Sequence, residues 1–233
     1  SPGSALYCTS VTYFLVESTS FFTCKTSNNH YAAIYFQNGG GQSVLYEVCA
    51  YDCCTTGGSY GYQFAYIQVG NVASNKNYVN YSSISRCVNE NSNSYHTLGL
   101  CYGKTFCPSI NISLNKCGRH SAIGCWPTVD SNYVTGSLIY SSFTDNNAVT
   151  YNCIWLNSGG AKSEIKSCNI LRNTQGTLDT YGTIYSNEIL TISDSCILEN
   201  IANRIFHQAS SSYTITLSNC TVDKTTNNQN LII

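Results

Sequence analysis

The sequence predicts an all-β protein, a right-handed parallel β-helix (solenoid) of about eight coils with short strands. Three observations predict this fold. A residue pattern recurs about every 25 residues, the recurring segments are rich in β-branched and aromatic residues, and good helix formers are rare. A coil of this kind cannot bury its apolar face alone, so stacked coils must share one continuous core.

The repeat is clearest in residues 164–173, Glu-Ile-Lys-Ser-Cys-Asn-Ile-Leu-Arg-Asn, with Cys168 as position zero. Further copies have their zero residues 24 to 38 residues apart, at Cys24, Cys49, Cys87, Cys117, Ser141, Ser195 and Cys220. The −3 position is large and apolar in every copy. It is therefore predicted to form one buried column, consisting of Phe21, Tyr46, Ile84, Leu114, Leu138, Ile165, Ile192 and Leu217.

The spacing within the repeat predicts a bend. Side chains at −3 and zero are three residues apart, so both point inward only if the strand turns between them. The +5 position is predicted to lie in a turn, where asparagine tolerates the left-handed conformation and stacked side chains hydrogen-bond along the axis. Asparagine occupies it as Asn29, Asn146, Asn173 and Asn200. A β-sandwich also has short strands, but it predicts no constant spacing around one apolar position.

We expect residues 1–233 to form a single β-helix domain. Residues 1–18 are interpreted as an N-terminal capping or docking segment. Residues 55–80, which fall in the longest interval between repeats, are interpreted as an insertion loop.

Phe143-x-x-Asn146, Ile170-x-x-Asn173 and Ile197-x-x-Asn200 resemble the F-x-x-N repeats of polymorphic outer-membrane proteins and related β-helix adhesins. Tyr31-Ala-Ala-Ile-Tyr and Tyr181-Gly-Thr-Ile-Tyr resemble weak versions of that family's G-G-A-I element. The resemblance implies surface display and adhesion. It supplies no catalytic residues.

Composition points to a secreted protein at the cell surface or outside the cell. Fourteen cysteines indicate an oxidising compartment, and the start at Ser-Pro-Gly suggests processing after a signal peptide. The expected disulfide partners are Cys8, Cys53, Cys54, Cys101, Cys107, Cys125 and Cys153. Sequons for N-linked glycans occur at Asn80, Asn111 and Asn219.

Several partners are not expected. The net charge of −1 lacks the basic excess that binds nucleic acid, and no apolar run is long enough to span a bilayer. His30, His96, His120 and His207 are scattered, with no cysteine at zinc spacing, so neither a metal nor a cofactor is expected.

Catalysis is also not expected. A β-helix glycosidase or lyase needs clustered carboxylates, and only twelve acidic residues occur. The +4 positions of the last coils hold Asp145, Arg172, Glu199 and Lys224, whose alternating signs favour a surface salt-bridge ladder. Tyrosine is the natural filler of half-exposed strands, although Tyr60, Tyr62 and Tyr66 could present a sugar-binding surface.

We therefore expect an extracellular structural solenoid, a subunit of a head-to-tail filament or surface layer. Its partner would be further copies of itself, joined through the apolar end Leu231, Ile232 and Ile233. The alternatives are an adhesin that binds surface carbohydrate and, less favoured, a polysaccharide lyase or glycoside hydrolase.

Overall fold

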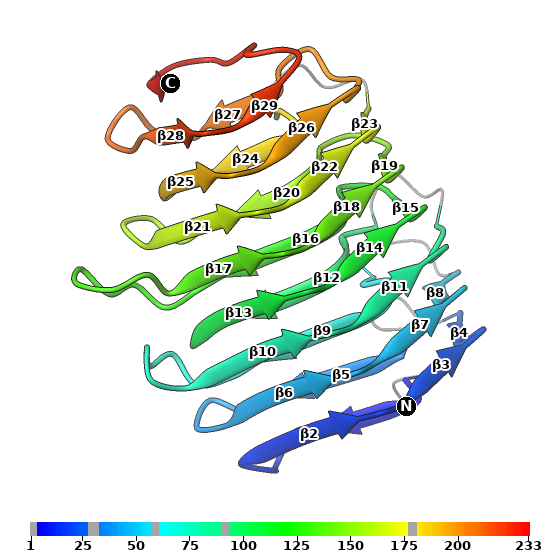
Figure 1. Cartoon of the computed structure of the whole chain (residues 1–233). Coiled ribbons are helices and arrows are strands. Elements are labelled where there is room, and N and C mark those ends of the chain that lie inside the picture. The colour runs from blue at the N-terminus through cyan, green and yellow to red at the C-terminus, as the bar shows by residue number, and fades with distance from the viewer. Residues whose placement is uncertain (1–3, 28–32, 57–60, 90–93, 177–180) are drawn as a thin grey trace.

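The chain folds into a right-handed parallel β-helix of about seven turns. The computed structural model describes residues 4–27, 33–56, 61–89, 94–176 and 181–233, and these contain strands and turns but no helix. Figure 1 shows the strands stacked one above another, with the first and last coils at opposite ends. All the strand pairs are parallel, as the repeat predicts.

Three long sheets form the walls of the solenoid. Sheet A contains β1 (Leu6–Cys8), β5 (Ile34–Gln37), β9 (Ala65–Gln68), β12 (His96–Cys101), β16 (His120–Trp126), β20 (Asn152–Leu156), β24 (Ile184–Ser186) and β27 (Phe206–Gln208). Sheet B contains β2 (Tyr13–Glu17), β6 (Gln42–Tyr46), β10 (Lys76–Asn80), β13 (Lys104–Pro108), β17 (Gly136–Ile139), β21 (Lys162–Lys166), β25 (Ile189–Ser193), β28 (Ile215–Ser218) and β30 (Leu231–Ile232). Sheet C contains β3 (Ser20–Phe22), β7 (Cys49–Tyr51), β11 (Ser83–Ser85), β14 (Asn111–Ser113), β18 (Ser142–Thr144), β22 (Asn169–Leu171), β26 (Cys196–Leu198) and β29 (Thr221–Val222).

Short strands follow sheet C before the chain returns to sheet A. They are β4 (Lys25–Thr26), β8 (Cys54–Thr55), β15 (Lys116–Cys117), β19 (Asn147–Ala148) and β23 (Thr174–Gln175). Each coil thus runs through sheet A, sheet B, a first corner, sheet C and a second corner.

The two corners share one local geometry. In the sixth coil Ser167 bends the chain between sheets B and C with a φ of 52°, and Arg172 bends it after sheet C with a φ of 53°. The residue after each bend, Cys168 or Asn173, turns its side chain inward and is buried. The predicted bend between −3 and zero is confirmed, whereas the left-handed residue near +5 is Arg172, one position before the asparagine.

Asparagines after the second corner form a buried ladder. The side-chain nitrogen of Asn115 donates to Asn146 Oδ1 at 3.0 Å, Asn146 donates to Asn173 Oδ1 at 3.0 Å, and Asn173 donates to Asn200 Oδ1 at 3.1 Å. Each amide nitrogen also donates to a carbonyl of the preceding coil, as Asn173 does to Phe143 O at 2.8 Å. The predicted hydrogen bonding along the axis is therefore confirmed, and it fixes the register of neighbouring coils.

The predicted apolar column is confirmed in its second half and wrong in its first half. Leu138, Ile165, Ile192 and Leu217 lie in register on β17, β21, β25 and β28, and all are buried. The earlier members of the sheet B column are Val16, Leu45, Val79 and Cys107.

The four misassigned residues occupy other positions. Phe21 and Ile84 are buried, but in the sheet C column that continues through Phe143 and Ile170. Tyr46 lies on sheet B, half-buried, at the position after the column. Leu114 is 46% exposed, with a φ of 59° at the second corner. Cysteine marks the repeat after the first corner in Cys168, whereas Cys24, Cys53 and Cys87 of the early coils follow the second corner.

The structure also contradicts the expected insertion loop at residues 55–80, whereas the expected capping or docking role of residues 1–18 stays a prediction. Residues 6–17 form β1 and β2, which pair with β5 and β6 as ordinary strands of the first coil. Residues 55–80 contain β9 and β10, which lie in sheets A and B. The longest interval therefore holds regular coil strands. Asn29, His30, Tyr31 and Tyr60 lie outside the described residues.

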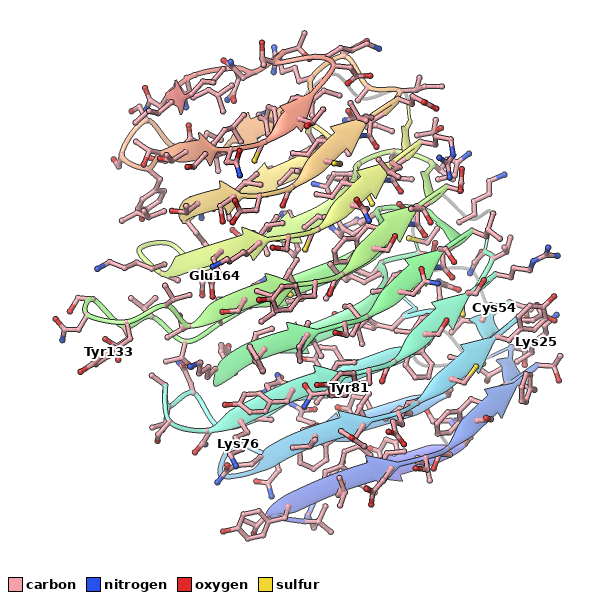
Figure 2. The ribbon with its side chains drawn as sticks, viewed as in Figure 1. Lys25, Cys54, Lys76, Tyr81, Tyr133 and Glu164 are labelled. Atoms are coloured by element: carbon pink, nitrogen blue, oxygen red, sulfur yellow. The ribbon has the colours of Figure 1, made fainter. Side chains whose placement is uncertain are left out.

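The outer surface carries most of the charge. Figure 2 shows Lys76 and Glu164 on the outer side of sheet B and Tyr133 at the tip of the loop between β16 and β17. Arg172 makes two hydrogen bonds to Asp145, at 2.8 and 2.9 Å, which is one pair of the predicted charged column. This pair is exposed, and exposed pairs contribute about 0–1 kcal/mol.

We expect Ile192→Ala to lower the free energy of unfolding by about 2–5 kcal/mol, because it leaves a cavity between Ile165 and Leu217. Urea unfolding followed by circular dichroism measures this change. Thr191→Ala is the matched control, since Thr191 is exposed on the same strand. Equal losses in the two variants would contradict the assignment of the core.

Candidate functional site

The outer face of sheet A carries a row of aromatic side chains that runs along the solenoid axis. Alternation along each strand points every second residue outward. The register of sheet A places one outward residue per coil in line: Tyr7, Tyr35, Tyr66, Gly99, Gly124, Trp155, Tyr185 and His207. All eight strands of sheet A thus supply either a ring or a glycine that makes room for one.

The two glycines make room for rings from neighbouring segments. A Cβ at Gly99 would lie 2.5 Å from the Tyr62 ring, and one at Gly124 would lie 2.2 Å from the His96 ring. His120 stacks on His96 with ring centroids 4.3 Å apart. The row therefore continues through Tyr62, His96 and His120 where the backbone position itself has no side chain.

Most of these rings cover one another's faces. His120 and Trp155 are 4.5 Å apart with 7° between their planes, and Tyr185 and His207 are 5.3 Å apart with 8° between theirs. Offset stacks of this kind contribute about 0.5–1.5 kcal/mol per pair beyond area burial. Since a stacked ring exposes only its edge, the stacked parts of the row offer no free aromatic face to a ligand.

Both histidines in the stack are held neutral. His96 and His120 are buried, and burial lowers the pKa of His96 well below its ordinary value and that of His120 to about 3. The Arg119 guanidinium adds to this effect, and it lies 4.4 Å from the Tyr95 ring centroid and 5.2 Å from that of Tyr151. These histidines serve as flat aromatic rings rather than as acids, bases or cations.

A pocket lies in the aromatic row of sheet A at the point where β12 carries small side chains. On β12 the outward residue Cys101 lies between Gln68 of β9 and Trp126 of β16, and Gly99 lies beside Gly124 of β16. The resulting pocket has a volume of about 210 Å³ and is lined by Tyr62, Tyr66, Gln68, Cys101, Tyr102 and Trp126. Here Trp126 stands at 89° to Trp155, so its ring is turned out of the stack.

The pocket is polar but uncharged. The Tyr66 hydroxyl donates to Gln68 Oε1 at 2.5 Å. Burial raises the pKa of the Cys101 thiol to about 12, so the thiol stays protonated. The lining thus combines aromatic rings, one amide and hydroxyl groups, which suits a small neutral ligand with both apolar and hydroxyl surfaces.

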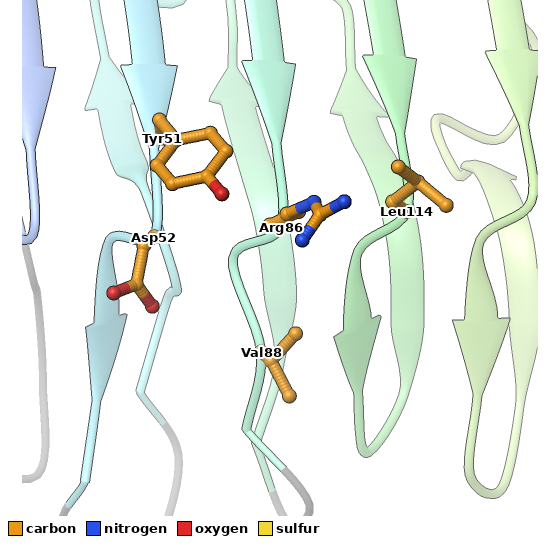
Figure 3. A pocket seen from close by; sticks show the side chains of 5 residues that line it. All are labelled: Tyr51, Asp52, Arg86, Val88 and Leu114. Atoms are coloured by element: carbon orange, nitrogen blue, oxygen red, sulfur yellow. The ribbon is translucent and has the colours of Figure 1, made fainter.

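A second hollow lies on the outer side of the second corner (Figure 3). It has a volume of about 510 Å³ and is lined by Tyr51, Asp52, Arg86, Val88 and Leu114. Its charged groups already have partners. Lys25 Nζ lies 2.7 Å from Asp52 Oδ2, and the Arg86 guanidinium lies 5.9 Å from the Tyr51 ring centroid. We therefore regard the aromatic pocket as the candidate site.

One buried carboxyl lies between sheets A and B. Glu188 is fully buried, Ser163 Oγ donates a hydrogen bond to it, and burial raises its pKa to about 8. Its partner is a hydroxyl, whereas a glycosidase pairs its carboxyl with a second carboxyl. Glu188 therefore has the environment of a neutral core residue.

The structure joins none of the expected disulfide partners by a covalent bond. All fourteen cysteines, including the seven expected disulfide partners, are free thiols. Within the described ranges, no group of three or more His, Cys, Asp or Glu residues could hold a metal ion, and no helix is long and apolar enough to cross a membrane. Tyr62 and Tyr66, considered as part of an aromatic loop, do line the pocket.

The sequons lie away from the aromatic row. Asn111 is exposed on β14, Asn219 is exposed just after β28, and Asn80 is half-buried at the end of β10 with its Oδ1 covered. Exposure thus favours Asn111 and Asn219 as acceptors over Asn80. A glycan at any of them would project from sheet B or C.

Comparisons with known proteins add no family. No protein-family model, curated protein or solved structure matches the chain. The function proposed for this protein is therefore inferred from the geometry of the chain itself.

We expect acid to destabilise the stack. Below about pH 6.5 the unfolded chain protonates its histidines, while buried His120 stays neutral down to about pH 3, so stability falls as the pH falls. His120→Phe keeps an aromatic ring and removes this proton uptake. The acid loss between about pH 7.5 and pH 5, measured by urea unfolding, should shrink by about 2 kcal/mol.

Comparing the pH dependence of unfolding in the wild type and in His120→Phe removes the contribution of the other titrating groups. The raised pKa of Glu188 acts in the opposite direction, since stability from this group is lost as the pH rises from its ordinary pKa towards about 8. That contribution is the same in both proteins. Tyr151→Phe, in a ring that contacts His120, is the control and should leave the pH dependence unchanged. An unchanged acid loss in His120→Phe would show that His120 already takes up a proton in the folded state.

Proposed function

We propose that this protein is an extracellular adhesive solenoid that binds carbohydrate through the aromatic pocket at Cys101. The observation that carries the proposal is the turned ring of Trp126 beside Tyr62, Tyr66 and Tyr102. A pyranose ring has an apolar face of C–H groups that packs on an aromatic ring, and its hydroxyls bond to amides such as that of Gln68. The pocket meets both needs within one concave surface.

The charge and size of the pocket narrow the ligand class. The six lining residues carry no formal charge at neutral pH, so acidic sugars find no cation there. The volume of about 210 Å³ is below the roughly 300–1,000 Å³ of sites that enclose a drug-sized ligand. The pocket therefore suits one neutral sugar ring of a longer glycan displayed on a surface.

The scaffold favours binding to a surface rather than turnover. The pocket lies on the flat wall of sheet A, between strands held in register on both sides. The sequons are on other walls, so attached glycans would leave this wall open. The extracellular location itself is proposed from the sequons and the high cysteine content.

We expect Trp126→Ala and Tyr62→Ala to weaken glycan binding at least tenfold, because each removes an aromatic wall of the pocket. The measurement uses an array of neutral galactose-, mannose- and N-acetylglucosamine-terminated glycans, with sialylated and sulfated glycans alongside, followed by calorimetry. Tyr140→Ala is the matched control, since Tyr140 is exposed at the first corner. If no neutral glycan is bound, or if the control loses binding equally, the proposal is wrong.

A second candidate function is head-to-tail assembly. Strands β2 and β30 are the outermost strands of sheet B, and the described part of the chain pairs each on one side only. The last strand is apolar, with Ile232 51% and Ile233 80% exposed. Unpaired strand edges attract further strands, and contact between unlike ends gives an open fibre.

Removal of residues 228–233 should abolish filaments if β30 forms the contact, because it removes this strand. Electron microscopy and sedimentation of the chain with and without these residues measure the effect. A chain that stays monomeric at high concentration, or a truncated chain that polymerises equally well, would exclude this mode of assembly.

A further inference from the structure

Three cysteines replace asparagine at the second corner in the early coils. The register aligns Cys24, Cys53 and Cys87 with the position that Asn115 continues. Cys87 N donates to Asn115 Oδ1 at 2.9 Å, as the later asparagines do to one another. The thiols thus form the first part of the same buried ladder, which we call the thiol column.

The asparagine ladder shows how close side chains at this position come. Side-chain atoms of consecutive asparagines lie 3.0–3.1 Å apart. In the thiol column the Cys53 thiol donates to Phe21 O of the preceding coil at 3.4 Å, as Asn173 does to Phe143 O, and the thiols of Cys24 and Cys87 are near enough to shift its pKa. Adjacent coils are about 4.8 Å apart, which lies within the 4.4–6.8 Å between Cα atoms that a disulfide spans.

The three thiols differ in exposure and acidity. Cys24 is half-exposed, whereas Cys53 and Cys87 are fully buried. The hydrogen bond from Cys87 lowers the pKa of Cys53 to about 7, with a smaller contribution from Cys24, while burial raises that of Cys24 to about 11. Cys24 is therefore the thiol that a solute reaches, and Cys53 is the base and nucleophile beside it.

We propose that the thiol column is a thiol–disulfide exchange site that is oxidised by small disulfides of the glutathione class. Cys24 passes its proton to Cys53 and attacks one sulfur of glutathione disulfide, which releases one glutathione thiolate. That thiolate takes the proton from Cys53. Cys53 then attacks Cys24 Sγ and releases the second glutathione, which takes its proton from solvent.

The overall reaction is a two-electron exchange between the protein and glutathione disulfide. The Cys24 thiol and the Cys53 thiolate together lose two electrons and one proton, and one glutathione disulfide gains these, with one proton from solvent, to become two glutathione thiols. Cys87 can then attack Cys53 Sγ and release Cys24 as a free thiol, which moves the bond inward with no further oxidation. Cys53 belongs to both possible disulfides, since Cys24 and Cys87 are two coils apart.

The test treats the folded chain with glutathione disulfide, traps remaining thiols with N-ethylmaleimide and maps the bonds by mass spectrometry. Chymotryptic cleavage after Phe22 and Tyr51 separates Cys24 from Cys53. We expect a peptide beginning at Thr23 linked to one beginning at Asp52, together with a fraction in which the Cys87 peptide replaces the first. Both linked products should disappear on reduction.

Matched variants decide the assignment. Cys53→Ser should abolish both linked products, whereas Cys54→Ser, the neighbouring buried cysteine, should retain them. Cys87→Ser should retain only the bond between Cys24 and Cys53, and circular dichroism confirms that each variant is folded. Linked products that persist in Cys53→Ser, a mixed disulfide that stops at Cys24, or no reaction at all would each overturn the proposal.

Discussion

The fold depends on one constraint, that every coil must return to the same register about 4.8 Å above the last. Left-handed residues at the two corners of a coil produce the turns, and at the described corners they are not glycine, as with Ser167 and Arg172. Such residues cost roughly 1–2 kcal/mol each. Where the residue after the bend is polar and turned inward, it offsets this cost by hydrogen-bonding to a neighbouring coil, as Asn173 does to Phe143 O and Cys168 does to Leu138 O.

The shared corner geometry explains what the sequence could and could not predict. At both corners of a coil the typical sequence is an inward apolar residue, an outward residue, a left-handed residue and an inward polar residue. Ile165 to Cys168 and Ile170 to Asn173 both fit this description. The repeat, and with it the β-helix, can therefore be recognised from the sequence. Because both corners share one pattern, however, the first corner of one coil can be aligned with the second corner of another. Phe21 and Ile84 were displaced in this way, and only the register between coils identifies the slip.

The candidate site depends on the same register, which is why residue patterns alone did not locate it. Tyr66 and Trp126 lie far apart in sequence and meet only because β9, β12 and β16 are adjacent. The clearest indication of the site in the sequence is the absence of a side chain at two strand positions. Gly99 and Gly124 interrupt strands that otherwise carry large side chains, and glycine within a strand often marks the close approach of another group. Tyr62 and Tyr66 could be proposed as binding residues from composition. The orientation of the Trp126 ring could not, since it depends on its neighbours on other coils.

The second corner shows how one position in a repeat can carry two chemistries. From Asn115 onward, each side chain donates to the preceding coil and accepts from the backbone of that coil, so both ends of the amide are satisfied. A thiol is a weaker donor and acceptor than an amide, so Cys24, Cys53 and Cys87 hold their coils together less strongly by hydrogen bonding. A covalent bond within the thiol column would replace what these coils lack. The ladder would then be secured by amides in its later coils and by oxidation in its earlier ones, which makes the early coils the part of the solenoid that responds to redox conditions.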